Sequence, residues 1–97
     1  MSQAHVLVVD DDPAVRDVLQ EVLRQEEYSV STAEDGAAAI QAVKDSVIHI
    51  VITDFQLPDI DGLEIIDRLA KLDAKIIPIM MTGFGTIETA VRAMKSG

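Results

Sequence analysis

The stretch Ile48–Gly62, IHIVITDFQLPDIDG, decides the fold that the rest of the sequence must form. It opens with a run of β-branched residues that stops at one carboxylate, Asp54. A short apolar run bounded by turn residues is typical of a strand buried on both faces, as in a parallel sheet. Because ligands of open α/β sheets gather outside the carboxyl ends of the strands, Asp54 is predicted to lie in a binding or reaction site.

The residues that follow Asp54 predict a turn and then a helix. Leu57-Pro58-Asp59 cannot continue the strand, because proline lacks the N–H group and restricts the residue before it. Asp59 is therefore predicted to be a turn residue. Asp61 is a candidate N-cap of the next helix, with Glu64 three residues on, as in a capping box.

A second strand-to-helix switch lies near the N-terminus. The apolar strand Val6–Val9 ends in Asp10, Asp11 and Asp12, and Pro13 follows directly. Aspartate is favoured at the N-cap and proline at the first helical position, so a helix is predicted from Pro13. One face of this helix is apolar and the other polar. The apolar positions are Val15, Val18, Leu19, Val22 and Leu23, and the polar ones are Arg16, Asp17, Gln20, Glu21 and Arg24.

The rest of the sequence continues the alternation of strands and helices. The predicted elements are an edge strand at Tyr28–Thr32, a helix at Ala37–Lys44, the central strand, a helix from Leu63 to Leu72, a strand at Ile76–Met81 and a helix from about Thr86 to Lys95. The helix from Leu63 is expected to face the core with Leu63, Ile66, Leu69 and Ala70. Pro78 indicates a sheet edge or a strand start. Single helices between strands imply an α/β fold, an open parallel sheet with helices on both faces.

The composition fits one small acidic domain. Of the 97 residues, 17 are acidic and 8 are basic, which gives a formal net charge of −9. This charge disfavours direct binding to nucleic acid and favours divalent cations as partners. The absence of cysteine excludes disulfides and Cys-based zinc sites and is typical of a reducing compartment. With neither a basic signal-peptide region nor an apolar run of ~20 residues, the domain is expected in the cytoplasm and not in a membrane.

Polar side chains come together where three of the predicted strands end. Asp10 and Asp11 follow the first strand, Asp54 ends the third, and Thr82 follows the fourth. Arginine or lysine could neutralise these carboxylates, but the surrounding segments supply no basic residue close in sequence. A divalent cation, Mg²⁺ or Mn²⁺, is therefore expected, because it prefers oxygen ligands and reverses the local charge. With the cation bound, Asp54 could attack a phosphoryl group as a nucleophile, and Thr82 would donate a hydrogen bond to it.

Several polar residues have a structural interpretation instead. Asp12 and Asp61 are expected N-caps, and a threonine before glycine, as at Thr82, is common in turns. Consecutive carboxylates at the end of a buried strand are harder to explain, because burial costs desolvation unless something pairs them. His5 and His49 precede strands at the opposite edge of the sheet, so both are expected to be structural.

Three motifs together resemble one family, and they are VLVVDDDPAVRDVL, VITDFQLPDIDGLE and PIMMTGFGTIETAVRAMKSG. In this order and at these separations they resemble the receiver domain of bacterial two-component response regulators, over the whole chain. The resemblance implies a flavodoxin-like fold with phosphorylation on Asp54. It also implies that Mg²⁺ is held by Asp10, Asp11, Asp54 and the backbone carbonyl of Gln56, and that Thr82 is the switch hydroxyl. The third motif is similar to receivers of transcription activators that work with the alternative sigma factor.

The resemblance implies a function and partners. Receivers accept a phosphoryl group from the phosphohistidine of a sensor kinase, or from a phosphotransfer protein, and control an output such as transcription. The expected function is thus phosphorelay signalling by a phosphoacceptor and not by an enzyme. The family continues into a fifth strand with a Lys-Pro pair and a fifth helix, whereas this sequence stops at Gly97. We expect residues 1–97 to form a single receiver domain of (βα)4 type, incomplete at its C-terminus, whose bare apolar face drives homo-oligomer formation.

Two other functions remain open on the sequence. Phosphatases of the haloacid dehalogenase type also begin with an apolar strand and Asp-x-Asp, as Asp10 and Asp12 do here. Their motif continues differently from Pro13-Ala14, and they need a longer chain. A passive interaction module without phosphotransfer is the third function. The residue that forms an acyl phosphate separates the first two, since it is Asp54 in a receiver and Asp10 in such a phosphatase.

Overall fold

The computed structural model describes residues 4–81 of the chain. The helix predicted from Thr86 to Lys95 and the predicted switch residue Thr82 lie outside these residues. The elements, in chain order, are β1 (His5–Val9), α1 (Pro13–Gln25), β2 (Ser29–Ala33), α2 (Gly36–Asp45), β3 (Ile50–Asp54), α3 (Gly62–Leu72) and β4 (Ile77–Met81). Strands and helices alternate as the sequence predicts, and one or both boundaries differ by one residue for β1, β2, α2, α3 and β4.

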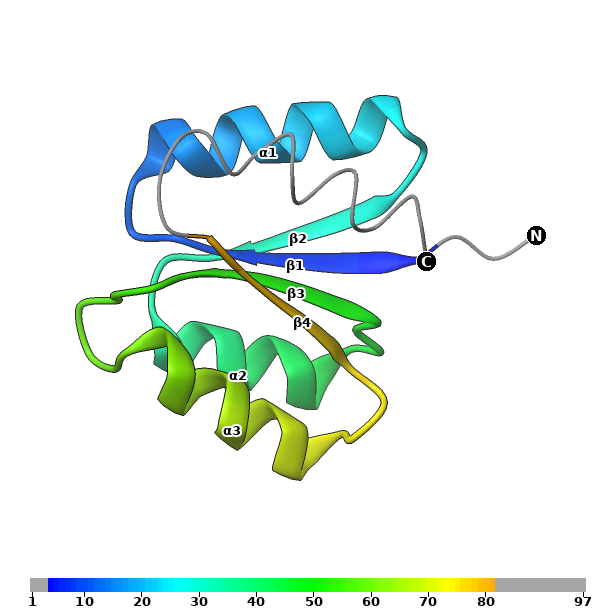
Figure 1. Cartoon of the computed structure of the whole chain (residues 1–97). Helices are drawn as coiled ribbons and strands as arrows, with labels where there is room; N and C mark the ends of the chain where they lie inside the picture. Colours follow the sequence, from blue (N-terminus) through cyan, green and yellow to red (C-terminus); the bar gives the residue numbers. More distant parts are fainter. Residues whose placement is uncertain (1–3, 82–97) are drawn as a thin grey trace.

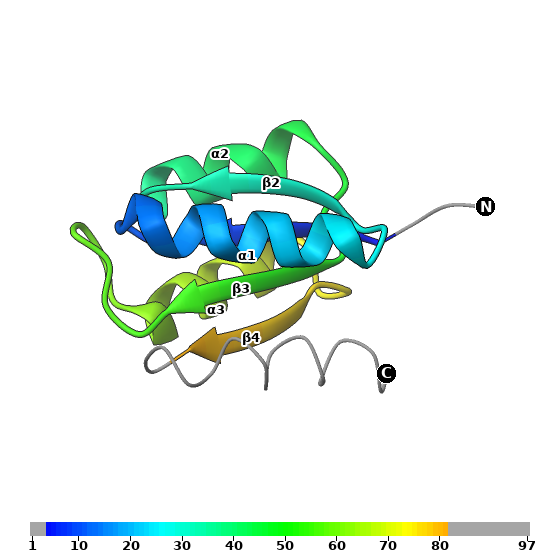
Figure 2. The ribbon, with the colours of Figure 1, turned by 90° about the horizontal axis from the view of Figure 1, so that it is seen from above.

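The strands form one parallel sheet in the order β2-β1-β3-β4, and Figure 2 shows their arrows running in the same direction. β1 and β3 therefore lie at the centre, where Val8 is paired with Ile52. β2 and β4 are the edges of the sheet that the structure describes, as the sequence predicts for both. Pro78 is paired with Val51 within β4, on a strand with one neighbour in this sheet, where the missing N–H group is tolerated.

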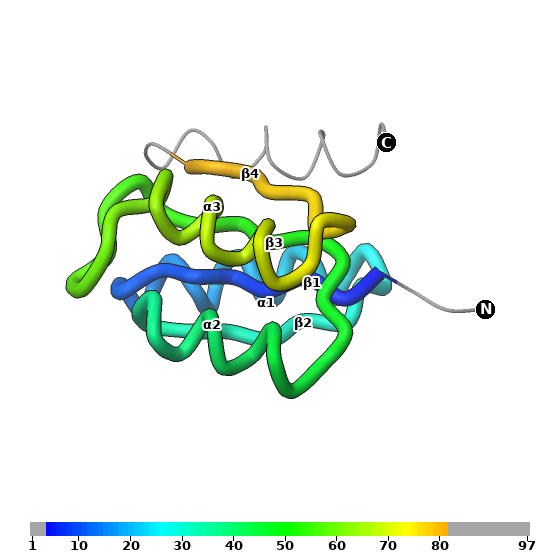
Figure 3. Tube along the Cα trace, turned by 90° about the horizontal axis from the view of Figure 1, so that it is seen from below, coloured from blue at the N-terminus to red at the C-terminus, as the bar shows by residue number. Residues whose placement is uncertain are grey.

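Helices cover both faces of the sheet, with α1 on one face and α2 and α3 on the other (Figure 1). The trace in Figure 3 shows α2 and α3 side by side. Alternate strand residues point to opposite faces, so each strand contributes to two apolar clusters. The cluster beneath α1 contains Val6, Val8, Leu19, Leu23, Ile50, Ile52 and Met81. The cluster beneath α2 and α3 contains Leu7, Val9, Ala33, Ala39, Ile48, Val51, Leu57, Ile65, Leu69 and Ile76.

Each helix begins at an aspartate N-cap, which ends the connection from the preceding strand. The side chain of Asp12 accepts a hydrogen bond from Ala14 N at 2.9 Å. Asp35 and Asp61 accept from the backbone of the third residue after each, at 2.8 Å in both cases. These bonds satisfy N–H groups that the helix itself leaves unpaired. The predicted caps Asp12 and Asp61 are confirmed.

The predicted inner face of α3 is partly wrong. Leu63 is 64% exposed and Ala70 is exposed, whereas Ile65 and Leu69 are buried. The cause is Gly62 at the first position of the helix, where an added Cβ would lie 2.5 Å from the carbonyl oxygen of Asp54. This close approach turns Gly62, Ile65 and Leu69 toward the sheet, and one residue further on the helix has rotated by about 100°. Leu63 therefore faces outward.

The predicted inner face of α1 needs a smaller correction. Leu19 and Leu23 are fully buried, but Val18 is 49% exposed at the flank of the stripe.

Within residues 4–81, no helix is both long enough and apolar enough to span a bilayer.

Candidate metal centre

Three carboxylates meet at the carboxyl ends of the two central strands. Val9 of β1 is paired with Thr53 of β3. Asp10 and Asp54, which follow these two residues, therefore lie side by side at the ends of the two strands. One oxygen from each of Asp10, Asp11 and Asp54 lies within 4.8 Å of the others. The strand-end pattern in the sequence thus placed these side chains together correctly.

Asp10 is the buried member of this acidic cluster, with 5% of its surface exposed. Its backbone N–H group donates to Ala33 O on β2 at 3.1 Å, and its Oδ1 accepts from Asp12 N at 2.9 Å. Burial raises the pKa of the Asp10 carboxyl above its usual range. The hydrogen bond from Asp12 N lowers this pKa, and the negative charges of Asp54, Asp11 and Asp12 raise it again. Among residues 4–81, the negative charge of this cluster therefore has no ion-pair partner.

Asp54 and Asp11 are more accessible. Asp54 is half-buried, and its Oδ1 accepts a hydrogen bond from Phe55 N at 2.7 Å. This bond orients the carboxylate at the end of β3. Asp11 is exposed. A group approaching from solvent thus meets Asp11 and Asp54 before it meets Asp10.

Of the other two predicted site residues, Gln56 and Thr82, the structure describes Gln56. Gln56 is in the loop after β3 and forms an isolated backbone bridge with Asp61. Thr82 lies outside the described residues, but Met81, the residue before it, is paired with Asp54. Met81 O also accepts from Phe55 N at 3.2 Å. The last described residue of β4 therefore lies beside Asp54.

Arg16 is a residue that the sequence analysis assigned to the polar face of α1 and missed at this site. It is half-buried, and its guanidinium Nη1 donates to the backbone carbonyl of Asp10 at 2.6 Å. The expectation that no basic residue reaches this edge was therefore wrong. The available signal was its spacing, four residues after the N-cap Asp12, which places Arg16 about one helical turn above the strand end.

The two histidines lie at the opposite edge of the sheet. His5 N donates to His49 Nδ1 at 2.9 Å, and His5 Nε2 is 2.6 Å from Ser31 Oγ. These contacts connect the first residue of β1 with the middle of β2 and with the residue before β3. Neither histidine approaches the acidic cluster, as the sequence analysis expected.

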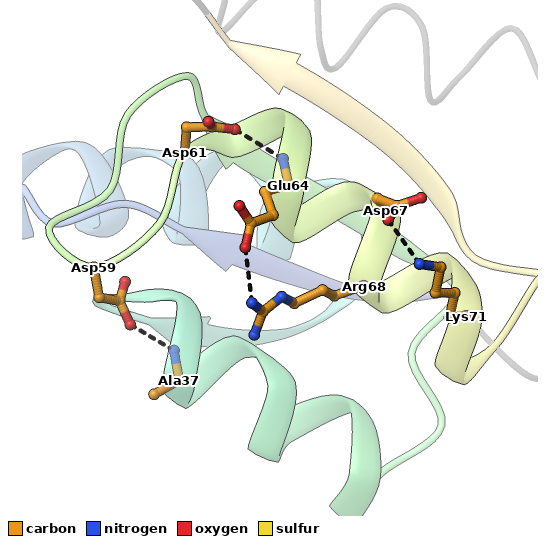
Figure 4. A network of polar contacts seen from close by, with 7 residues as sticks. All are labelled: Ala37, Asp59, Asp61, Glu64, Asp67, Arg68 and Lys71. Atoms are coloured by element: carbon orange, nitrogen blue, oxygen red, sulfur yellow. Dashed lines mark hydrogen bonds and ion pairs between the residues drawn. The ribbon is translucent and has the colours of Figure 1, made fainter.

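The acidic cluster fits a hard divalent cation. All its donors are carboxylate oxygens, which Mg²⁺ and Mn²⁺ prefer. Within residues 4–81 the ion pairs join Arg68 to Glu64 and Lys71 to Asp67, all on α3 (Figure 4). Neither pair neutralises the cluster, and the neutral carbonyl that Arg16 contacts leaves the charges of the carboxylates in place. A bound divalent cation would compensate these charges.

Comparison with known families decides between the functions left open by the sequence. The family described as the response regulator receiver domain matches residues 6–97 of this chain. The chain belongs to the receiver family. Receivers are phosphoacceptor domains of two-component systems, so the domain acts in signal transduction based on phosphorylation. The resemblance seen in the sequence motifs is thereby confirmed.

Relatives and solved structures agree with this assignment. The receiver is 35% identical over 95 residues to the transcriptional regulatory protein ZraR of Klebsiella oxytoca, covering 98% of this chain and 21% of that protein. It thus spans about a fifth of the length of the curated relatives it matches.

Two solved receivers share the fold. A CheY-like receiver from Methanospirillum hungatei JF-1 has a TM-score of 0.82 and 29% identity, over 99% of this chain and 77% of that one. The response regulator TrrA of Thermotoga maritima has a TM-score of 0.80 and 26% identity, over 96% and 98%. TrrA was crystallised in complex with Mg²⁺-BeF. The flavodoxin-like architecture predicted from the sequence is confirmed.

Proposed function

We propose that Asp54 is the phosphoacceptor of this receiver, and that Asp10, Asp11, Asp54 and the carbonyl of Gln56 hold Mg²⁺ or Mn²⁺. The observation that supports this best is the convergence of three carboxylates, within 4.8 Å, at the carboxyl ends of the central strands. The more exposed Asp11 and Asp54 are the direct carboxylate ligands in this proposal. Buried Asp10 acts mainly through a water molecule.

The residues suit transfer of a phosphoryl group to Asp54. An oxygen of Asp54 attacks the phosphorus of a phosphohistidine, the P–N bond breaks, and the imidazole leaves with the electron pair. The amide of Phe55, which already donates to Oδ1, holds the carboxylate during the attack. A bound cation would neutralise the carboxylates and the phosphoryl oxygens. The hydroxyl of Thr82 would donate to one of those oxygens as the switch residue.

The proposal extends to partners and output. We infer a sensor histidine kinase or phosphotransfer protein as the phosphodonor, and control of transcription as the output, in line with the regulator ZraR. The domain promotes only its own phosphorylation and dephosphorylation and is otherwise no enzyme. The formal charge of −9 supports no direct contact with nucleic acid, and the cysteine-free sequence accords with a cytoplasmic location. A second copy of the chain is a further partner.

Burial argues against a phosphatase that uses Asp10 as its nucleophile. Asp10 is 5% exposed, and one of its oxygens accepts the Asp12 amide, whereas Asp54 is half-buried at the mouth of the cluster. We therefore favour Asp54 over Asp10 as the attacking group.

Mapping the acyl phosphate tests the proposal. The chain is incubated with acetyl phosphate and Mg²⁺, the acyl phosphate is trapped by borohydride reduction, and the modified residue is located by peptide mass spectrometry. We expect modification at Asp54, lost in Asp54→Asn and retained at a reduced level in Asp10→Asn. Modification at Asp10 would indicate the phosphatase chemistry instead. No modification at either residue would favour a passive interaction module.

A further inference from the structure

Asp59 makes a contact that joins the loop of the acidic cluster to a distant helix. Its Oδ1 accepts from Gly36 N at 2.8 Å and its Oδ2 accepts from Ala37 N at 3.0 Å, in the first turn of α2 (Figure 4). Asp59 lies in the loop after β3, as predicted for a turn residue, and its hydrogen-bond partners lie more than 20 residues away in the sequence, which the turn prediction does not include. Both oxygens of one carboxylate thus bridge the loop after β3 and the start of α2.

The two segments also pack closely beside this bridge. Gly36 is buried, and a Cβ added to it would overlap Cγ2 of Ile60, the residue after Asp59. Ile60 in turn packs against the apolar cluster beneath α2 and α3. The loop therefore rests on α2 through an apolar contact as well as through the two hydrogen bonds.

Hydrogen bonds connect the tip of the loop to its base. Asp59 and Ile60 lie at the tip, and Leu57 N donates to Ile60 O at 3.1 Å across it. Gln56 is bridged to Asp61 below, and Gly62 N donates to Phe55 O at 2.7 Å at the base. Gln56 and the tip are thus parts of one hydrogen-bonded unit that begins next to Asp54.

The start of α2 does not depend on Asp59 as its N-cap. That helix has its own N-cap, Asp35, whose side chain accepts from Ala38 N at 2.8 Å. The hydrogen bond from Gly36 N holds the pKa of the Asp59 carboxyl below its usual range. Partial desolvation raises this pKa, and the hydrogen bond from Ala37 N lowers it again. The ionised carboxylate also lies at the helix end that favours negative charge. Asp59 therefore acts as a charged tie between two segments.

We propose that Asp59 is a positioning residue of this receiver, which fixes the backbone carbonyl of Gln56 for the cation by tying the loop to α2. The inference rests on the proposed function, because it needs a cation at the acidic cluster. Asp59 touches neither the cation nor the phosphoryl group. It acts through the loop, in the way that outer partners orient metal ligands.

Calorimetric titration of the whole chain with MgCl₂ tests this positioning role. We expect Asp59→Ala to raise the Kd for Mg²⁺ about tenfold. Asp59→Asn should give a smaller rise, because its one oxygen accepts only one of the two N–H groups. Gly36→Ala should also raise the Kd, since the new methyl group pushes Ile60 and the loop away from the helix side. The matched control is Asp35→Ala, which removes a bond to the same helix turn but none to the loop, and its Kd should equal that of the parent.

Amide hydrogen exchange gives a second readout that does not depend on the cation. Without Mg²⁺, the amides of residues 55–61 should exchange faster in Asp59→Asn than in the parent, and at the parental rate in Asp35→Ala. An unchanged Kd in the Asp59 variants, or an equal rise in Asp35→Ala, would overturn the inference. If the parent itself binds no Mg²⁺, both the proposed function and this inference fail. If the parent binds and the Asp59 variants bind equally well, only the inference fails.

Discussion

Asp10 is the buried carboxylate of the acidic cluster, and its burial is expected to cost stability when no cation is bound. Its carboxyl is buried beside Asp11, Asp12 and Asp54, and both burial and their charges raise its pKa. A buried charge next to like charges destabilises the folded chain unless a cation compensates it. We therefore expect Asp10→Asn to raise the unfolding free energy of the metal-free chain by about 1 kcal/mol. The amide oxygen of asparagine can still accept from Asp12 N, so the backbone is retained.

Thermal melts with EDTA and with Mg²⁺ test this trade-off. For a domain of this size, about 1 kcal/mol corresponds to a rise of about 4–8 °C in Tm. With Mg²⁺ the advantage should shrink or reverse, because the cation stabilises the parent more than the variant. Asp17→Asn, which removes an exposed charge from α1, is the matched control and should change the stability by less than about 0.5 kcal/mol. A destabilised Asp10→Asn in EDTA would show that Asp10 is held for structure.

Individual site residues differed in how well the sequence predicted them. The convergence of Asp10, Asp11 and Asp54 was predictable, because parallel strands end at one edge of the sheet. Arg16 and Asp59 were not. Each bonds to backbone atoms of another segment, and periodicity within one helix or loop contains no information about such a contact.

At the scale of elements, the end of α1 stores backbone strain. Glu27 has φ of 69°, and it is the one non-glycine residue with positive φ in the described part of the chain. Glu27 N donates to Arg24 O at 2.9 Å and Tyr28 N donates to Leu23 O at 3.1 Å, the two bonds of a Schellman motif. Glycine is the usual residue at this position, because a Cβ is unfavourable in the left-handed conformation.

We expect Glu27→Gly to stabilise the domain by about 0.5–1 kcal/mol, since relief of the strained φ outweighs the greater freedom of glycine in the unfolded chain. Urea denaturation monitored by circular dichroism measures this difference. Glu27→Ala is the control, because it removes the same side chain but keeps a Cβ at positive φ, and it should give no gain. Equal stability of the two variants would mean that the side chain, and not the backbone, decides the effect.

The same motif explains why one element boundary was misplaced. The strand predicted at Tyr28–Thr32 is Ser29–Ala33 in the structure, because Tyr28 still closes the C-terminal cap of α1. With no glycine to mark the helix end, the sequence showed only β-forming residues after Glu27. The N-terminal ends were predicted well, because Asp12-Pro13 and Asp61-Gly62 are strong local signals. The inner face of α3 was predicted less well, since it depends on how closely Gly62 approaches the backbone of Asp54.

At the scale of the whole molecule, the two edges of the described sheet differ in chemistry. β2 is rich in hydroxyl side chains, with the sequence SVSTA, whereas β4 reads IPIMM. Ile77 on β4 is 50% exposed although it is apolar. An apolar edge strand with exposed side chains is a surface on which a second chain can pair. Association through β4 is opposed by the formal charge of −9 on each copy.

These opposing forces make salt the variable that controls self-association. Between about 0.1 M and about 1 M salt the Debye length falls from about 10 Å to about 3 Å, so repulsion between copies weakens while apolar contacts persist. We therefore expect light scattering across a dilution series of the 97-residue chain to show a dimer whose share rises with salt. Ile77→Lys should abolish this rise, because it places a charge on the edge strand. Val47→Lys, the same change at a position that is 71% exposed between α2 and β3, should leave the rise intact. A parent that stays monomeric at every salt and protein concentration would contradict pairing through β4. If the two lysine substitutions have equal effects, the association depends on net charge alone.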